Sequence, residues 1–268
     1  MHDDAVLKRL KKIVGEDDHS MNPDEVSLGY KKVTAAEKKV VVARYFDTIA
    51  QRYDLADTLL SLGLHHVWKQ RTVKFLGLQK GELVLDVCGG TADLALRAAT
   101  AMRPEGHVIV YDMSRAMMEM GKEKVKRSRE TLPILFVQGD AERISFPEDT
   151  FDAVMVGFGV RNLAHPFEGL QEMFRVLRRG GRLACLEFSL PTLPLFRSLY
   201  QLYSFKVMPR AGKWITGARE PFSYLVESIR VFPTSEKIAE VMREIGFSNV
   251  SFRRLTGGLA VVYLGVKA

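Results

Sequence analysis

The stretch VLDVCGGTADLALRA, residues 84–98, decides the fold class of this chain. Mostly apolar residues come first, then a turn of small residues, and then apolar positions at helical spacing. The two glycines of the turn, Gly89 and Gly90, leave room for a ligand to approach the backbone. The turn lacks the dinucleotide pattern G-x-G-x-x-G. The stretch therefore predicts a strand, a ligand-binding turn and a helix, with a ligand other than a dinucleotide.

The alternation of strand and helix continues along the chain. β-rich runs follow at 107–112, 134–140, 151–159 and 182–189. Helices are expected at 91–102, 114–129 and 166–178. Such alternation indicates parallel βαβ units with helices on both faces of a sheet. The last two strands, NVSFRRL and LAVVYLGV, are joined by a short Gly turn and should finish the sheet antiparallel. We expect an α/β, Rossmann-like fold with a seven-stranded, mostly parallel sheet.

Three segments lie outside this alternation. Residues 1–30 form an N-terminal appendage with a short basic amphipathic helix, and residues 31–268 form one domain. Within it, 34–76 is predicted to be a helical cap that begins with a Thr-x-x-Glu capping box. After the fifth strand, the Pro- and aromatic-rich insertion 190–233 is typical of a segment that covers a substrate pocket.

Composition narrows the setting of the protein. The chain has 268 residues and only two cysteines, Cys88 and Cys185, which we interpret as buried free thiols in a reducing compartment. His65 and His66 are adjacent and make a poor metal site, and we expect no metal. No apolar run of about 18 residues or more is present, which favours a cytoplasmic protein. A net charge of +7 permits an anionic partner, either nucleic acid or a lipid surface. Alternatively, the clustered basic residues simply form solvated helix faces.

Acidic residues follow three successive strands of the predicted sheet. Asp112 ends the second strand and can accept both hydroxyls of a ribose. Asp140 follows the third strand and can accept an adenine amino proton, with the Ala141 amide facing a ring nitrogen. Asp86, at the end of the first strand, can lie near an α-ammonium group. A ligand with a ribose, an adenine and a zwitterionic amino acid is S-adenosylmethionine. The alternative is that each strand-end Asp only caps the following helix.

Two longer motifs resemble a known family. Residues 53–68, YDLADTLLSLGLHHVW, and residues 175–189, RVLRRGGRLACLEFS, are similar to segments of the ubiquinone/menaquinone biosynthesis C-methyltransferases. GFGVRNL at 157–163 and REPFSYLVESIRVFP at 219–233 resemble further segments. The likeness begins at about Val33 and reaches the C-terminus. It implies the class I methyltransferase fold and S-adenosyl-L-methionine as cofactor.

The resemblance also implies site residues. Arg161 and Asn162 would border the methyl acceptor, and Tyr53 lies in the helical cap beside it. His65 is either a base or, as we favour, a packing histidine. The cofactor would be bound by Asp86, Gly89, Gly90, Thr91, Asp112, Met113, Asp140, Ala141 and Gly157.

The acceptor implied by the resemblance is a polyprenyl quinol. Methyl transfer to carbon needs an electron-rich ring, so we expect the acceptor to be the quinol and not the quinone. The first candidate acceptor is demethylmenaquinol, and the methoxy-benzoquinol of ubiquinone synthesis is an additional or alternative acceptor. The prenyl tail favours peripheral contact with the inner face of the membrane. A homodimer or a quinone-synthesis assembly stays open.

Departures from the family pattern leave alternatives open. Ala56-Asp57 replaces Met-Asn, and Arg178-Arg179 replaces Lys-Pro. Ala92 replaces a glycine of the turn, and Gly157 stands where many members have serine; these two could indicate a non-catalytic relative. Methylation of RNA or of another small molecule is a further alternative. The Pro-Pro-aromatic run of enzymes that methylate base amino groups is missing after the fourth strand, so we expect no nucleic-acid partner.

Overall fold

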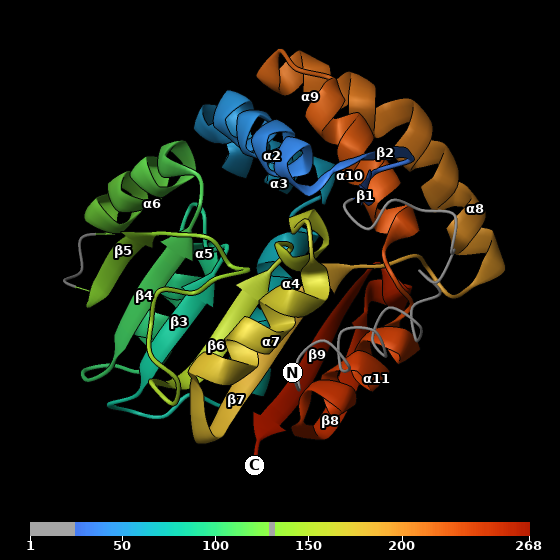
Figure 1. Cartoon of the computed structure of the whole chain (residues 1–268). Coiled ribbons are helices and arrows are strands. Elements are labelled where there is room, and N and C mark those ends of the chain that lie inside the picture. The colour runs from blue at the N-terminus through green and yellow to red at the C-terminus, as the bar shows by residue number, and fades with distance from the viewer. Residues whose placement is uncertain (1–24, 129–131) are drawn as a thin grey trace.

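A seven-stranded sheet forms the centre of the protein (Figure 1). The computed structural model describes residues 25–128 and 132–268, so the amphipathic helix expected near the N-terminus lies outside the described residues. The strands are β3 (Leu83–Val87), β4 (His107–Asp112), β5 (Ile134–Gln138), β6 (Phe151–Gly157), β7 (Leu177–Phe188), β8 (Phe247–Leu255) and β9 (Ala260–Lys267). Their order is β5-β4-β3-β6-β7-β9-β8. β9 runs antiparallel to both of its neighbours and the other pairs are parallel, which confirms the predicted fold class.

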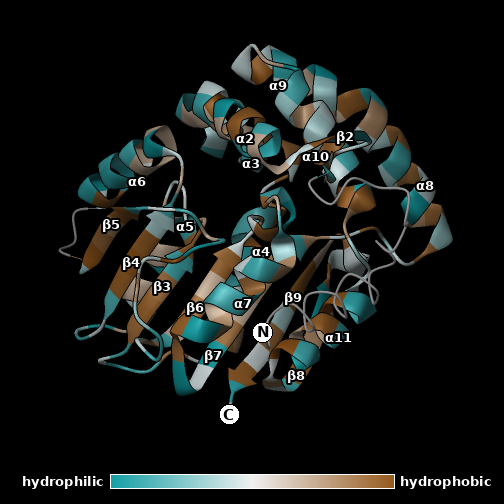
Figure 2. Cartoon of the chain, in the orientation of Figure 1, coloured by the Kyte–Doolittle hydropathy of each residue, from teal (hydrophilic) through white to brown (hydrophobic). Residues whose placement is uncertain are grey.

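Helices cover both faces of the sheet because successive strand residues point to opposite sides. On β3, Leu85 and Val87 belong to one buried cluster, which also holds Leu170 of α7. Val84 belongs to the other cluster, with Trp68 of α4. Figure 2 shows apolar strands beside helices of mixed hydropathy. The layer helices are α4 (Leu64–Leu76), α5 (Asp93–Ala101), α6 (Arg115–Arg127), α7 (Pro166–Val176) and α11 (Ser235–Ile245).

A second group of helices lies above the carboxyl ends of the parallel strands (Figure 1). It contains α2 (Ala35–Ile49), α3 (Tyr53–Leu60), α8 (Pro194–Leu202), α9 (Met208–Thr216) and α10 (Glu220–Val231). Short helical turns η1 (Ala50–Arg52), η2 (Val160–Asn162), η3 (Tyr203–Val207) and η4 (Thr256–Gly258) complete the chain. The expected helical cap and the helical insertion 190–233 therefore meet at one end of the sheet.

Local chemistry sets where these elements begin and end. The predicted capping box is present, since Thr34 accepts from the Glu37 N–H and the Glu37 carboxylate accepts from the Thr34 N–H. The helix predicted to 178 ends at Val176, because Leu177 is extended and already pairs with Phe151 in the sheet. A hairpin of β1 (Glu25–Leu28) and β2 (Lys31–Thr34) was not expected from the sequence.

Candidate functional site

Two cavities meet above the carboxyl ends of the strands. The larger, of about 360 Å³, is lined mainly by apolar and aromatic side chains of the helical cap and the insertion, and we call it the apolar pocket. The smaller, of about 120 Å³, lies over the turns after β3, β4 and β6, and we call it the polar pocket. Phe46, Tyr53 and Asn162 line both cavities and so form their shared wall. A ligand in each cavity would meet the other at this wall.

The polar pocket collects nearly all of the residues predicted to bind the cofactor. Those in its lining are Asp86, Gly89, Gly90, Thr91, Asp112, Met113, Ala141 and Gly157. Asp112 accepts the Gly90 N–H through one carboxylate oxygen and the Ser114 N–H through the other, both at 2.8 Å. Burial raises the pKa of Asp112 to about 6 although these N–H donors lower it. The carboxylate thus lies fixed at the edge of the pocket as an acceptor for hydroxyl groups.

Asp86 is fully buried and has one free oxygen. Its Oδ2 accepts the Ala95 N–H at 3.0 Å, while Oδ1 has no hydrogen-bond partner. Burial raises the pKa of Asp86 well above its usual value. An orphaned buried acceptor costs free energy unless a ligand satisfies it. The pocket therefore fits a ligand that brings a donor, and an ammonium group meets this need.

The backbone around the polar pocket is strained and crowded. Cys88, Ala92 and Phe158 all have positive φ, of 53°, 64° and 58°, which costs a residue with a Cβ about 1–3 kcal/mol. At Ala92 the left-handed conformation is one that glycine adopts without this cost. A Cβ at Gly157 would lie 2.8 Å from Leu94 Cδ1, so a serine there would need Leu94 to move.

Asp140 differs in placement from the other predicted residues. It is not part of the pocket lining. Its Oδ2 lies 2.7 Å from Lys39 Nζ of α2, and its Oδ1 accepts the Glu142 N–H. Lys39 also pairs with Glu142 and lines the polar pocket, so in this structure an ammonium group takes the position expected for the adenine amino group.

Arg161 and Asn162, the residues predicted to border the methyl acceptor, lie on η2 and line the apolar pocket. Arg161 is buried, and its Nη1 lies 2.8 Å from a carboxylate oxygen of Glu187, which is also buried. Its Nε has no partner, and neither have Asn162 Oδ1 and Tyr224 OH. These three orphaned polar atoms belong to residues of a mainly apolar and aromatic wall, so the cavity fits an apolar ligand with few polar groups.

Beside the shared wall lies a buried ionic network that the sequence did not reveal, with Asp57 in the lining of the apolar pocket and Lys69 and Asp93 in that of the polar pocket. Lys69 Nζ lies 2.9 Å from Asp57 Oδ2 and 2.8 Å from Asp93 Oδ2, joining α3, α4 and the start of α5. Burial alone would raise the pKa of Asp57, but Lys69 and His65 lower it to about 2. Tyr53 lines the wall, and burial raises its pKa, so its phenol stays protonated and can donate.

His65 belongs to this network and lines neither pocket. Its Nδ1 lies 2.9 Å from Asp57 and its Nε2 lies 3.1 Å from the Thr58 hydroxyl, so both ring nitrogens have partners. This placement favours the packing histidine over the base.

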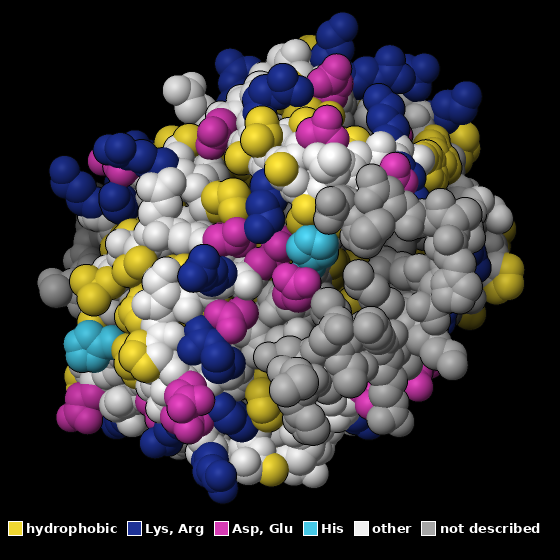
Figure 3. Space-filling model, viewed as in Figure 1, with side chains coloured by type: hydrophobic (Ala, Val, Ile, Leu, Met, Phe, Trp, Pro, Cys, Tyr) yellow, Lys and Arg dark blue, Asp and Glu magenta, His cyan; other side chains and the backbone are white. Residues whose placement is uncertain are grey.

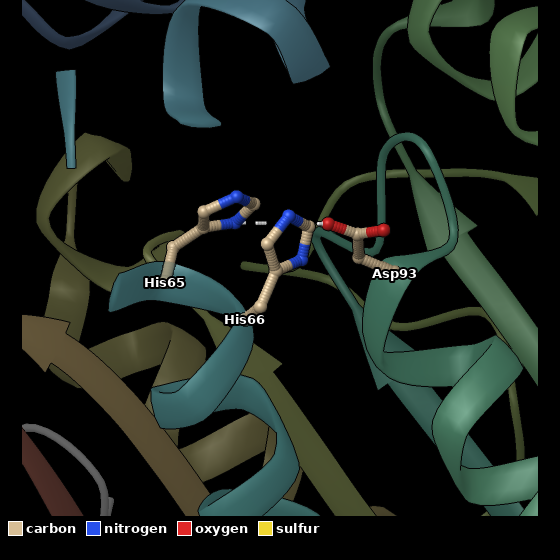
Figure 4. A group of neighbouring side chains, drawn as sticks. All are labelled: His65, His66 and Asp93. Carbon is tan, nitrogen blue, oxygen red and sulfur yellow. Dashed lines mark ion pairs between the residues drawn. The ribbon is translucent and has the colours of Figure 1, made fainter. Parts of the chain in front are cut away.

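The ligand atoms of His65, His66 and Asp93 come together closely enough to suggest a metal site (Figure 4). The Lys69 ammonium lies 3.0 Å from His65 Nδ1 and 2.8 Å from Asp93, and the Arg97 guanidinium lies 3.1 Å from His66 Nδ1. Cations of the protein already occupy the ligand atoms, so binding an additional divalent cation here would bring like charges together.

The sheet order, the turn after β3 and the position of the polar pocket match the class I S-adenosylmethionine-dependent methyltransferase fold. Solved structures share the fold: a methyltransferase from Thermotoga maritima has a TM-score of 0.58 at 19% identity, covering 85% of this chain and 100% of that one. The [4+2]-cyclase SpnF has a TM-score of 0.61 at 14% identity, covering 84% and 94%.

The chain belongs to the ubiE/COQ5 methyltransferase family, whose model matches residues 32–267. A UbiE ubiquinone/menaquinone biosynthesis C-methyltransferase from Pseudomonas entomophila is 41% identical over 89% of this chain and 93% of its own length. That of Francisella philomiragia is 40% identical over 89% and 96%. The resemblance seen in the sequence is thereby confirmed, and with it S-adenosylmethionine as the cofactor of this enzyme class.

Proposed function

We propose that this chain transfers a methyl group from S-adenosylmethionine to a ring carbon of a polyprenyl quinol, with demethylmenaquinol as the first candidate. The observation that carries this proposal is the shared wall of Phe46, Tyr53 and Asn162 between a polar and an apolar pocket. The names of the relatives, C-methyltransferases of ubiquinone/menaquinone biosynthesis, support it. A methoxy-benzoquinol would fit the same pocket chemistry.

The residues of the polar pocket would hold the cofactor. Asp112 would accept the ribose hydroxyls, and the free oxygen of Asp86 would accept from the ammonium group. When bound there, S-adenosylmethionine supplies an electrophilic methyl group on a sulfonium. The protein's contribution is to align the acceptor carbon with that group, an effect worth up to ~7–11 kcal/mol.

The apolar pocket would orient the quinol. The reaction would join the methyl carbon to a ring position ortho to a hydroxyl, and the donor would leave as a neutral thioether. The hydroxyl proton would leave as this bond forms, and loss of the hydrogen on the methylated carbon, with return of a proton to the oxygen, would restore the aromatic ring. A guanidinium is too basic a group to serve as the proton acceptor, so the base is not Arg161. Its free Nε can donate to the developing phenolate, and Asn162 Oδ1 can accept from the second hydroxyl. A water held beside these groups would take the proton, while Tyr53 donates from the shared wall.

A lipid acceptor also bears on where the protein works. Among the described residues, no helix combines the length and apolar character needed to cross a bilayer. We propose peripheral contact with the inner face of the membrane from the cytoplasm, since a prenyl tail stays in the lipid. A homodimer or a quinone-synthesis assembly is compatible with this arrangement.

The decisive experiment is methyl transfer from radiolabelled S-adenosylmethionine to demethylmenaquinol, under dithionite and again in air. Label in the organic phase only under reduction would support both the activity and the quinol as acceptor. No label in either condition, beside an active control enzyme, would refute the proposal. Calorimetry with S-adenosylhomocysteine would then show whether the chain is a non-catalytic relative.

A further inference from the structure

Helix α8 presents an apolar stripe to solvent. Leu195, Leu199 and Leu202 follow one another at spacings of four and three residues, so they share one face of the helix. Their exposed fractions are 77%, 59% and 61%. The apolar surface continues along the chain to Trp214 of α9, which is 85% exposed. We call this surface the α8–α9 face; its apolar members are Leu193, Leu195, Leu199, Leu202, Phe205, Val207 and Trp214.

The charged residues of the segment that carries the α8–α9 face are all basic. Between Glu187 and Glu220 the sequence contains no Asp or Glu. The exposed basic residues of the face are Arg197, Lys206, Arg210 and Lys213. Lys and Arg side chains gather over this end of the molecule in Figure 3. Leucines and a tryptophan mixed with cations, without acidic residues, are the composition of helices that lie on anionic membranes.

The face also borders an opening of the apolar pocket at Leu199. Leu199 on α8 and Leu62, just after α3, both line that pocket, and Leu62 is 82% exposed. A residue that lines a cavity and is also largely exposed lies at its mouth. The cavity therefore opens where the exposed leucines are concentrated.

The α8–α9 face is fixed to the rest of the protein. Tyr203 OH donates to the Leu60 carbonyl at 2.9 Å, and Arg52 Nη1 donates to the Ile215 carbonyl at 2.6 Å. The Arg230 guanidinium lies 4.0 Å from the centre of the Phe205 ring. These contacts tie η3 and α9 to α3, η1 and α10, and α8 runs directly into η3 at Tyr203, so the face exists before any partner arrives.

We propose that the α8–α9 face docks on an anionic lipid bilayer and brings the mouth of the apolar pocket to the lipid. This inference rests on the proposed function, because it gives a membrane-resident quinol a direct route to the pocket. Two copies of the chain meeting through this face would bring like charges together, which argues against self-association. A bilayer with anionic headgroups matches both the leucines and the cations.

The test uses the full chain with vesicles of phosphatidylcholine alone or mixed with phosphatidylglycerol. Trp68 is buried, so a blue shift of fluorescence and quenching by brominated acyl chains report on Trp214. Leu195→Asp should weaken vesicle binding more than tenfold, and Lys213→Glu severalfold at low salt. Leu135→Asp is the matched control, since Leu135 is 59% exposed on strand β5 and lines neither pocket.

Binding to the mixed vesicles that Leu195→Asp loses and Leu135→Asp keeps supports the proposal. Failure of the wild-type chain to bind either vesicle overturns it, as does binding that Leu195→Asp leaves unchanged. A wild-type dimer that Leu195→Asp converts to a monomer, without vesicle binding, assigns the face to a second copy instead. Methyl transfer to a tail-less quinol in solution should be equal in the wild-type chain and the three variants, so this experiment and that of the proposed function fail separately.

Discussion

Cofactor affinity should fall sharply in mild acid because of Asp112. Its carboxylate, with a pKa of about 6, must be ionised to accept two ribose hydroxyls while it also accepts the Gly90 and Ser114 N–H groups. The dissociation constant should then scale as one plus ten to the power of 6 minus pH. Between pH 8 and pH 5 this predicts about a tenfold loss of affinity, or about 1.4 kcal/mol.

Isothermal calorimetry with adenosine isolates this effect. Adenosine carries the ribose but no amino acid, so the titration of Asp86 does not enter the measurement. Asp112→Asn should bind adenosine about tenfold or more weakly at pH 8, because a neutral amide accepts through one oxygen only. Its affinity should also be independent of pH. Equal affinity of the wild-type chain at pH 5 and pH 8 would refute the assignment of Asp112 to the ribose.

Loss of binding at pH 5 should not reflect unfolding caused by Asp112. Its folded pKa of about 6 is above its usual 3.8, so the folded state binds the proton more tightly than the unfolded state. Ionised Asp112 therefore costs stability at neutral pH, and this cost disappears as the pH falls from about 6 towards 4. Thermal unfolding of the free protein at pH 5 and pH 7 checks this sign.

Three further substitutions test the architecture of the site. Glu187→Gln leaves the Arg161 charge buried without its partner, and should lower the free energy of unfolding by about 3 kcal/mol in urea melts; an unchanged midpoint would contradict the buried pair. Gly212→Ala places a Cβ against the Phe222 ring in the wall of the apolar pocket, so KM for the quinol should rise severalfold while affinity for S-adenosylhomocysteine stays the same. Asp57→Asn should cost about 2 kcal/mol at pH 7, since the pKa of Asp57 is lowered from 3.8 to about 2; the difference from wild type should shrink as the pH falls from about 4 to 2.

Much of the polar pocket could be predicted because its residues are local to strand ends. In a parallel sheet the carboxyl ends of neighbouring strands meet at one edge, so Asp86, Asp112 and Ala141 converge whatever the details of packing. Asp140 shows the limit of this reasoning. Its partner Lys39 comes from α2, about a hundred positions away, and no local pattern predicts that pairing.

The apolar pocket was only partly predictable for the same reason. The aromatic residues of 190–233 indicated a pocket, but their composition did not say which would point inward. Tyr224 lines the pocket, whereas Trp214 is 85% exposed. The ionic network of Asp57, Lys69 and Asp93 was missed because it joins three helices whose contacts depend on packing.

The sequence by itself determined the order of strands and helices along the chain, the capping box at Thr34 and the glycine turn at Gly89, because these follow from short-range periodicity and local hydrogen bonding. The family could be recognised from the sequence because the motifs at 53–68 and 175–189 resemble those of its members. The tertiary structure alone decided which charges pair, where the two pockets share Phe46, Tyr53 and Asn162, and that the leucines of α8 face outward. Helical spacing shows that Leu195, Leu199 and Leu202 form a stripe. Whether a stripe is buried or exposed depends on what packs against it, and that is a property of the whole fold.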